Sequence, residues 1–252
     1  MAKIAFHLTV SEGKRLIARA VAALPEVRKG LETGTVIICK GSTNAYIVEE
    51  VLGRTIDKPT YLTGNTQPVR GASPMTAERV PDVVLRAGVP LEGVSAIAAA
   101  ADLGPGDVLI KGANALSPDR RMAGVLVGDR TGGTVGNTAG HVIGKNALQL
   151  TPVGLEKTIA GDLWEIAGRV NDQEPALSDI PQLWISQGRI ITEIEALAVL
   201  AGVEALPMAA GGINGAEGAT WFLAWGDEAM LDRCRAIVDS VQGEPPFHTP
   251  GQ

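Results

Sequence analysis

Three polar, glycine-containing segments each follow an apolar run that has the character of a strand. They are Gly41-Ser-Thr-Asn44, Lys111-Gly-Ala-Asn114 and Thr131-Gly-Gly-Thr134. Hydroxyl, amide and ammonium groups beside helix N-termini suit a phosphate or a carboxylate, because the free backbone amides there carry partial positive charge. The same residue types also form ordinary turns and N-caps. Three such segments after successive strands favour a site for a small anion.

Lys111 has the widest chemical range of these residues. At the end of a strand it can bind an anion, act as a base or amine nucleophile if burial lowers its pKa, or simply remain solvated. We predict Lys111 and Asn114 as the catalytic candidates. The predicted anion-binding residues are Lys40, Gly41, Ser42, Thr43, Asn44, Gly112, Ala113, Arg130, Thr131, Gly132, Gly133 and Thr134.

Histidine and cysteine offer little further chemistry. His141 is either a proton carrier facing the site or a histidine of the helix surface or core, and the second reading is favoured. Cys39 ends an apolar strand and is interpreted as a small core residue. Cys39 and Cys234 are too few and too far apart for a disulfide framework, and three histidines form no recognisable metal motif. We predict neither a metal nor a cofactor.

Charge and hydropathy exclude two classes of partner. The net charge is −6, and lysine and arginine are not clustered, which argues against nucleic acid and against an anionic membrane surface. No apolar run approaches the roughly 18 residues that a membrane-spanning helix needs. We expect a cytoplasmic protein, because two cysteines do not suggest an oxidising compartment.

The elements that must position the polar segments alternate along the chain. A capping box of Thr9 and Glu12 opens the first helix, which continues to Pro25. Helical spacing recurs at 45–52, 91–101 and 134–145, and strand patterns at 35–39, 83–85, 107–110, 122–127 and 147–153. This order predicts a three-layer α/β/α, Rossmann-like core with a mostly parallel sheet. Residues 57–76 lack periodicity and are predicted to be a long connection that lines the site.

The order of elements changes near residue 176. Strands at 203–208 and 220–225 follow each other without a helix between them, and helices are predicted at 192–200 and 228–241. We therefore expect a Rossmann-like domain at 1–176, a small α+β, half ferredoxin-like domain at 177–243 and a flexible tail at 244–252. The loop Gly211–Gly218 is a mobile closing or packing element or, slightly favoured, a long hairpin turn.

This order of motifs resembles the superfamily of ribose-5-phosphate isomerase A, glucosamine-6-phosphate deaminase and coenzyme A transferases. Ile38-Cys-Lys-Gly-Ser-Thr43 is similar to the phosphate loop of the isomerases. Lys111-Gly-Ala-Asn-Ala115 matches the frame of their Asp-Gly-Ala-Asp-Glu motif, and Arg130-Thr-Gly-Gly133 resembles their Lys-Gly-Gly-Gly loop. The resemblance spans most of the chain and implies a sugar-phosphate or coenzyme A-type ligand.

The departures from that pattern concern the chemistry. Lys111 and Asn114 stand where the isomerases have two carboxylates, and no glutamate lies between Val135 and Lys145. Neither Glu156 nor Glu217 lies in a motif that matches the transferase nucleophile. We expect a homodimer that binds a small phosphorylated or carboxylated metabolite and has lost the isomerase chemistry. The alternatives are a non-catalytic sensor or interaction protein, and an enzyme with reassigned chemistry centred on Lys111.

Overall fold

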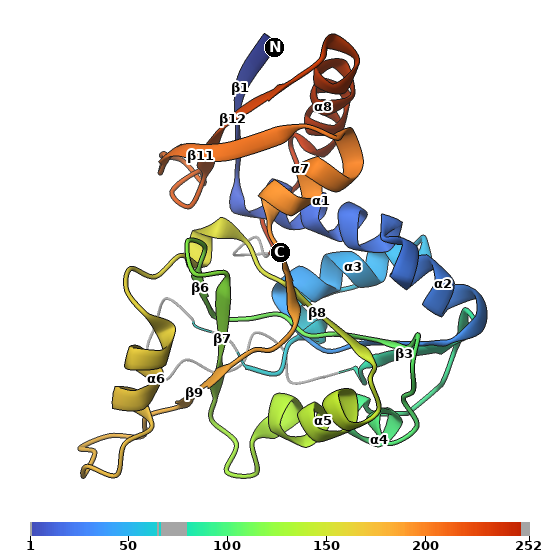
Figure 1. Ribbon diagram of the computed structural model, residues 1–252, viewed down its shortest axis with the longest axis vertical. Coiled ribbons are helices and arrows are strands. Elements are labelled where there is room, and N and C mark those ends of the chain that lie inside the picture. The colour runs from blue at the N-terminus through green and yellow to red at the C-terminus, as the bar shows by residue number, and fades with distance from the viewer. Residues whose placement is uncertain (1, 65, 67–79, 248–252) are drawn as a thin grey trace.

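Four parallel strands form the centre of the fold in the computed structural model, which describes residues 2–64, 66 and 80–247. The protein is mixed α/β and has three sheets (Figure 1). The central sheet has the order β10-β8-β5-β2-β3-β4. Its strands are β10 (Arg189–Ile191), β8 (Leu148–Pro152), β5 (Val108–Ile110), β2 (Thr35–Ile38), β3 (Val83–Arg86) and β4 (Val89–Pro90). The first four are mutually parallel, whereas β3 and β4 are antiparallel.

Helices cover both faces of this sheet because its parallel strands are apolar on both sides. Val36 and Ile38 pack into the larger core, beneath α1 and α3, whereas Ile37 faces the smaller core with α4. Figure 1 shows α4 and α5 on one side of the sheet and α1, α2 and α3 on the other. The bounds are α1 (Val10–Ala23), α2 (Pro25–Thr33), α3 (Ser42–Leu52), α4 (Ala96–Ala100), α5 (Gly133–Gly144) and α7 (Glu193–Ala201).

Local sequence signals place most of these helices. The predicted capping box is confirmed, since Glu12 N donates to Thr9 Oγ1 and Thr9 N donates to Glu12 Oε2. The helix predicted at 91–101 is shorter, because Gly93 has a positive φ of 71° and Ser95 caps the first turn of α4. Helix α2 was missed because Pro25 reads as a stop, yet proline is well tolerated at the first position of a new helix.

A second sheet corrects the prediction of a mostly parallel arrangement. It has the order β6-β7-β9, and both of its pairings are antiparallel. Its strands are β6 (Ala115–Ser117), β7 (Met122–Val127) and β9 (Gln182–Ile185), and it contacts α6 (Leu163–Val170). The run 122–127 was expected to continue the parallel series. A strand pattern shows that a strand forms but does not identify its partner, and here the short turn after Ser117 makes β6 and β7 a hairpin.

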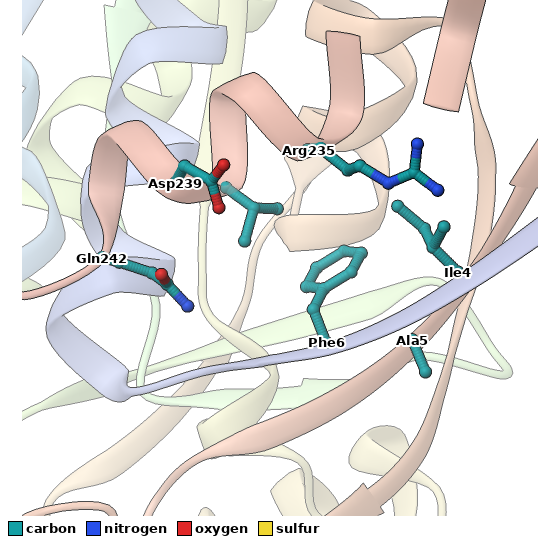
Figure 2. A pocket seen from close by; sticks show the side chains of 7 residues that line it. Ile4, Ala5, Phe6, Arg235, Asp239 and Gln242 are labelled. Carbon is teal, nitrogen blue, oxygen red and sulfur yellow. The ribbon is translucent and has the colours of Figure 1, made fainter. Parts of the chain in front are cut away.

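The third sheet joins the two ends of the chain. It has the order β1-β12-β11, with β1 (Ala2–Leu8), β11 (Glu204–Ala210) and β12 (Thr220–Gly226), and α8 (Glu228–Val241) packs on it. The loop Gly211–Gly218 connects β11 and β12 as predicted. The range 177–243, however, contributes strands to all three sheets, and β1 supplies an edge of the small one. Figure 2 shows the side chains of Ile4 and Phe6 of β1 directed toward α8 and that of Ala5 directed away from it. This alternation of side chains makes β1 amphipathic.

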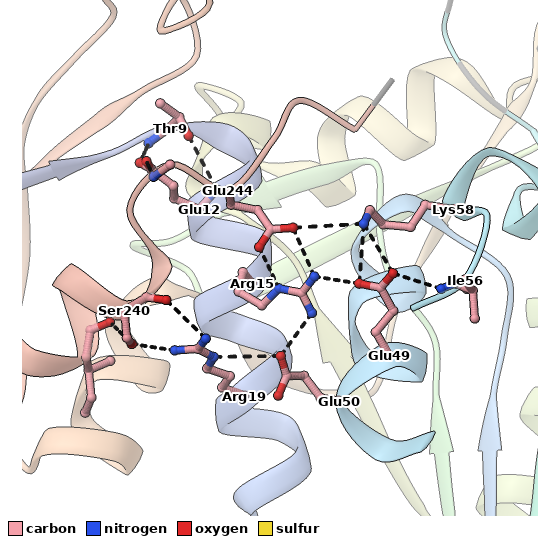
Figure 3. Close-up of polar contacts among 12 residues, drawn as sticks. Thr9, Glu12, Arg15, Arg19, Glu49, Glu50, Ile56, Lys58, Ser240 and Glu244 are labelled. Carbon is pink, nitrogen blue, oxygen red and sulfur yellow. Dashed lines mark hydrogen bonds and ion pairs between the residues drawn. The ribbon is translucent and has the colours of Figure 1, made fainter. Parts of the chain in front are cut away.

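Arg15 of α1 ties three segments together through carboxylates (Figure 3). Its guanidinium contacts Glu49 at 2.5 Å, Glu50 at 2.9 Å and Glu244 at 2.9 Å. Lys58, in the short 3-10 helix η1 (Lys58–Tyr61), also reaches Glu49 at 3.3 Å. Glu244 begins the segment 244–252 that we expected to be flexible, and residues 248–252 lie outside the described part. These residues are named the Arg15 network below.

Candidate functional site

The carboxyl ends of the four parallel strands carry the candidate site. Ile38 of β2 is in register with Ile110 of β5, and Ile110 with Leu150 of β8. Beyond β8, Val153 N donates to Ile191 O at the end of β10. The loops after the four strands therefore open on one edge of the sheet, where ligands of open α/β sheets bind. The predicted segments beginning at Lys40 and Lys111 are two of these loops.

Side-chain hydrogen bonds join each loop to the next. Asn44 Nδ2 donates to Cys39 O at 2.7 Å and to Ile110 O at 3.2 Å, which links the ends of β2 and β5. Lys157 Nζ donates to Ala113 O at 2.8 Å, which links the loops after β8 and β5. These hydrogen bonds hold the loops after β2, β5 and β8 in fixed positions relative to one another.

The fourth loop is joined by a buried carboxyl group. Leu155 N donates to Glu193 Oε2 at 3.0 Å, so the segment after β8 is bonded to the first residue of α7, which follows β10. Glu193 lies in a capping box formed by Thr192 and Glu195, which fixes the start of that helix. Two features therefore place Glu193: the capping box that begins α7 and the parallel register of β10 with β8.

Three lysines and two glutamates gather at this edge of the sheet. We name the following residues the strand-end cluster: Lys14, Thr43, Asn44, Lys111, Glu156, Lys157 and Glu193. Burial lowers the pKa of Lys14, Lys111 and Lys157 below the ordinary lysine value. Lys157 lowers the pKa of Lys111 further by charge repulsion, which shows that the two ammonium groups share one electrostatic environment.

Glu156 and Glu193 approach each other over Gly154. A Cβ atom at Gly154 would overlap Glu156 Oε2 and would lie 3.1 Å from Glu193 Oε1. A Cβ atom at Gly13 of α1 would lie 2.6 Å from the same Glu193 oxygen. Burial and the neighbouring Glu156 raise the pKa of Glu193 to about 8. Glu193 is therefore largely protonated at neutral pH.

Buried polar atoms without partners lie in the same cluster. Thr43 Oγ1, Asn44 Oδ1 and Glu156 Oε1 accept or donate no hydrogen bond within the part of the chain that the structure describes. Thr43 is 2 % exposed and Asn44 is fully buried. Asn44 Oδ1 would lie 3.8 Å from a Cβ atom at Gly112, so it is directed at the loop that follows Lys111. Buried polar groups are rarely left unpaired, and such groups mark a place for a ligand or for water.

The predicted residues of the first loop differ in what they leave available. Lys40 N donates to Asp82 Oδ1 at 3.1 Å, and Gly41 N donates to Tyr61 O at 3.0 Å. Ser42 and Thr43 instead begin α3, where backbone amides have no partner inside the helix. An anion at this loop would therefore meet the first turn of α3 rather than Lys40 N or Gly41 N.

The structure places the third predicted loop in a different setting. Arg130 and Thr131 are exposed and follow β7 of the second sheet, while Gly132, Gly133 and Thr134 open α5. Thr131 Oγ1 donates to Asp129 Oδ1 at 2.5 Å, and Asn137 Nδ2 donates to Gly133 O at 2.7 Å. Among the described residues, no hydrogen bond or ion pair connects this loop to the other two.

Asn114 also has a structural contact. Its backbone N donates to Gly124 O at 2.7 Å, and its side-chain Oδ1 accepts a hydrogen bond from Leu126 N at 3.0 Å. These bonds join the start of β6 to β7, and the residue is exposed. The catalytic role of Asn114 stays a prediction. Cys39 is 1 % exposed, as expected of a core residue, and burial raises its pKa to about 12.

Four members of the strand-end cluster were not among the predicted site residues: Lys14, Glu156, Lys157 and Glu193. No sequence motif brings them together, because they come from α1, from the loop after β8 and from α7. Two weak signals were present. Gly13 interrupts the first predicted helix, and Glu193 directly follows a strand-like run within a capping box. A glycine inside a helix often marks a close approach by another group.

Two other classes of site are absent from residues 2–64, 66 and 80–247. No helix there is long and apolar enough to cross a membrane, and no three histidine, cysteine or acidic side chains are grouped for a metal ion. Comparison of the chain with protein-family models, curated proteins and solved structures finds no match. The geometry of the strand-end cluster is therefore the basis on which a function is inferred.

Proposed function

We propose that the protein binds a small phosphorylated or carboxylated metabolite at the strand-end cluster. One observation carries this proposal: Lys111 and Lys157 are desolvated beside each other, and neither has an ion-pair partner within 4.0 Å among the described residues. Both lysines are half-buried, and Asp82 and Glu156 act on them only from beyond ion-pair distance. A desolvated cation without a direct ion-pair partner is unfavourable unless something supplies the opposite charge. An anionic ligand would supply it.

The balance of charge supports the same ligand class. With Glu193 protonated near neutral pH, Glu156 beside Lys14 and Lys157 and Asp82 near Lys111 are the carboxylates that face the three lysines of the cluster. Thr43 Oγ1 can donate to a ligand oxygen, and the first turn of α3 adds backbone amides with partial positive charge. These groups suit phosphate and carboxylate oxygens.

We extend the proposal to the scaffold. Helices on both faces of a sheet with four parallel strands support a divergent, three-layer Rossmann-like core. The resemblance to the isomerase and transferase superfamily implies a ligand at the strand-end loops of such a core. A sugar phosphate or a coenzyme A-type compound is accordingly the first ligand class to test. A cytoplasmic homodimer is the assembly that we propose.

A second candidate is an enzyme that uses the same cluster for acid–base chemistry. The observation that favours it is the approach of Glu156 and Glu193 over Gly154, with Glu193 held protonated. The carboxylates missing from the family-like positions at Lys111 and Asn114 would thus be replaced from other elements. A protonated carboxyl group beside a bound anion can act as a general acid, and a lysine of lowered pKa can act as a base.

A thermal-shift titration at pH 6.5 tests the binding proposal. The probes are inorganic phosphate, sugar phosphates, acyl coenzyme A species and nucleotides, and a ligand of the native state raises Tm. We expect at least one probe to raise Tm, and Lys111→Met or Lys157→Met to remove the shift. Lys29→Met, an exposed lysine on α2, is the matched control and should keep it.

Two results would overturn the binding proposal: no stabilisation by any of these anions, or an undiminished shift in both Lys111→Met and Lys157→Met. The enzymatic candidate needs a further assay. Any probe that binds is incubated with wild type and with Glu193→Gln, and products are followed by NMR. Binding without turnover in wild type would reject that candidate and leave the binding proposal in place.

A further inference from the structure

The two edges of the small sheet differ in how well they are protected. On β11, Pro207 lacks an amide hydrogen, and the pairing with β12 shifts register between Pro207 and Ala209. Prolines and bulges of this kind prevent an edge strand from pairing with another chain. On β1, all seven residues pair with β12 without a shift, and no strand in the described residues pairs with its other edge. A regular, unprotected edge strand is a template for a further strand.

A groove runs along this free edge between β1 and α8 (Figure 2). Ile4 and Phe6 point into it from β1, whereas Ala5 points to the opposite face of the strand. Val238 of α8 also lines the groove, and Arg235, Asp239 and Gln242 complete the lining. An apolar strip beside unpaired strand amides is the geometry in which an added strand gains both hydrogen bonds and side-chain burial.

We propose that a second copy of this chain occupies the groove, with the two β1 strands paired antiparallel about Ala5. A twofold axis at Ala5 sets Ile4 of each copy opposite Phe6 of the other, on the side that faces α8. The apolar strip is then continued across the axis, as a self-complementary interface requires. The two three-stranded sheets become one six-stranded sheet.

The charges that line the groove fit this occupant. Arg235 and Asp239 are one helical turn apart on α8, so they share a face. The axis that pairs β1 with itself also runs the two α8 helices antiparallel, which sets Arg235 of each copy against Asp239 of the other. Within one copy, Arg235 forms an exposed ion pair with Asp232 at 2.8 Å, and Asp239 has no ion pair with any described residue. A cation and an anion are thus available on each copy.

Sedimentation equilibrium over a range of protein concentrations tests the interface. Wild type is expected to show a dimer of twice 26.1 kDa. Asp239→Arg sets like charges against each other and should weaken the dimer at least tenfold, as should Arg235→Asp. The double variant restores opposite charges and should recover the affinity to within about threefold. Glu32→Arg, which makes the same charge change as Asp239→Arg at an exposed position of α2, is the control.

A cysteine at the axis tests the register. Directly opposed residues of an antiparallel pair have Cβ atoms about 5 Å apart, so Ala5→Cys should give a disulfide-linked dimer under mild oxidation. Ala2→Cys, which is also exposed but lies away from the axis, should remain uncrosslinked. Cys39 and Cys234 are buried and should not react. A monomer at every concentration, a dimer indifferent to Asp239→Arg, or equal crosslinking by Ala2→Cys would overturn the proposal.

Discussion

Lys14 and Arg15 are consecutive residues of α1, yet they enter two opposite electrostatic environments. Arg15 meets three carboxylates and lies 4.8 Å from the Tyr46 ring centroid. Lys14 is 8 % exposed and enters a cluster in which lysines outnumber carboxylates. Burial opposes ionisation of Glu49, but hydrogen bonds from Arg15 and from Ile56 N hold its pKa below the ordinary value. In the strand-end cluster, burial dominates and shifts the pKa of the three lysines and of Glu193 toward the neutral form.

The difference separates two uses of buried charge. Arg19 Nε lies 3.7 Å from Glu50 Oε1, so three cations face the three carboxylates of the Arg15 network. A network whose charges are matched in this way holds segments together, because removing one member leaves the others uncompensated. A cluster whose charges are unmatched reduces stability until a ligand completes it. The Arg15 network joins α1, α3 and the segment after α8, whereas the strand-end cluster lies where ligands bind. Variants that affect stability and binding in opposite ways would sharpen this contrast.

The largest effect is expected from Arg15→Ala. The variant leaves Glu49, whose side chain is 4 % exposed, with Lys58 as its remaining ion-pair partner, and should lower the free energy of unfolding by about 3 kcal/mol. Urea denaturation measures the loss. Arg169→Ala removes an exposed arginine with two carboxylate contacts and should cost less than about 1 kcal/mol. Equal losses in the two variants would contradict the matched-network interpretation.

The next effect concerns pH. Glu193 keeps its proton in the folded state up to about pH 8, whereas the unfolded chain releases it near the ordinary glutamate value. The native state therefore binds more protons in this window, and its stability falls as pH rises, by about 2 kcal/mol between pH 5.5 and pH 7 from this group. Glu193→Gln should remove that part of the fall, as measured by urea denaturation at both pH values. Glu204→Gln, an exposed change on β11, should leave the slope intact.

A pair of lysine variants should differ in sign. Lys111→Met removes a desolvated charge whose described hydrogen bond is a 3.3 Å contact to Gly112 O, and should leave stability unchanged or raise it by about 1 kcal/mol. Lys58→Met removes a partner of Glu49 and should lower stability by about 1 kcal/mol. Thermal and urea unfolding report both values. Destabilisation by Lys111→Met as large as that by Lys58→Met would mean that Lys111 is paired in the native state.

The smallest effect separates two buried threonines. Thr43 Oγ1 has no described partner, so Thr43→Val should be nearly neutral for stability and should weaken the response to an anionic probe. Thr151 Oγ1 lies 2.8 Å from Ser186 Oγ, so Thr151→Val should cost about 1 kcal/mol and leave that response unchanged. Thermal unfolding with and without inorganic phosphate tests both. A reversed order of the two losses would contradict the assignment of Thr43 to the site.

The sequence was most informative where a signal is local. The capping box at Thr9 and Glu12 and the apolar run of β2 predict their elements because the relevant contacts are a few residues apart. Strand pairing is not local, and β7 joined the second sheet although its pattern resembles that of β5. The loop after β7 was therefore wrongly expected to lie after a strand of the parallel series.

The candidate site shows the same division. The strand-end rule brought the loops of Asn44 and Lys111 together, and the structure joins them through Ile110 O. The approach of Glu156 and Glu193 could not be predicted, since it depends on β10 pairing with β8 and on the packing of α1 against α7. Carboxylates were expected to be missing because Glu156 and Glu193 lie on separate elements and belong to no short motif.

Gly13 and Gly154 also bear on how this protein tolerates mutation. Each lies where a side chain would occupy the space of a carboxyl group, so alanine at either position must displace Glu193 or Glu156. The displaced atoms are the ends of flexible side chains, so alanine at either position should be tolerated for folding but should shift the carboxyl groups of the strand-end cluster. A loss of ligand binding in a folded Gly13→Ala or Gly154→Ala variant would then reflect the volume that the glycine leaves for a neighbouring carboxyl group, rather than any chemistry of its own.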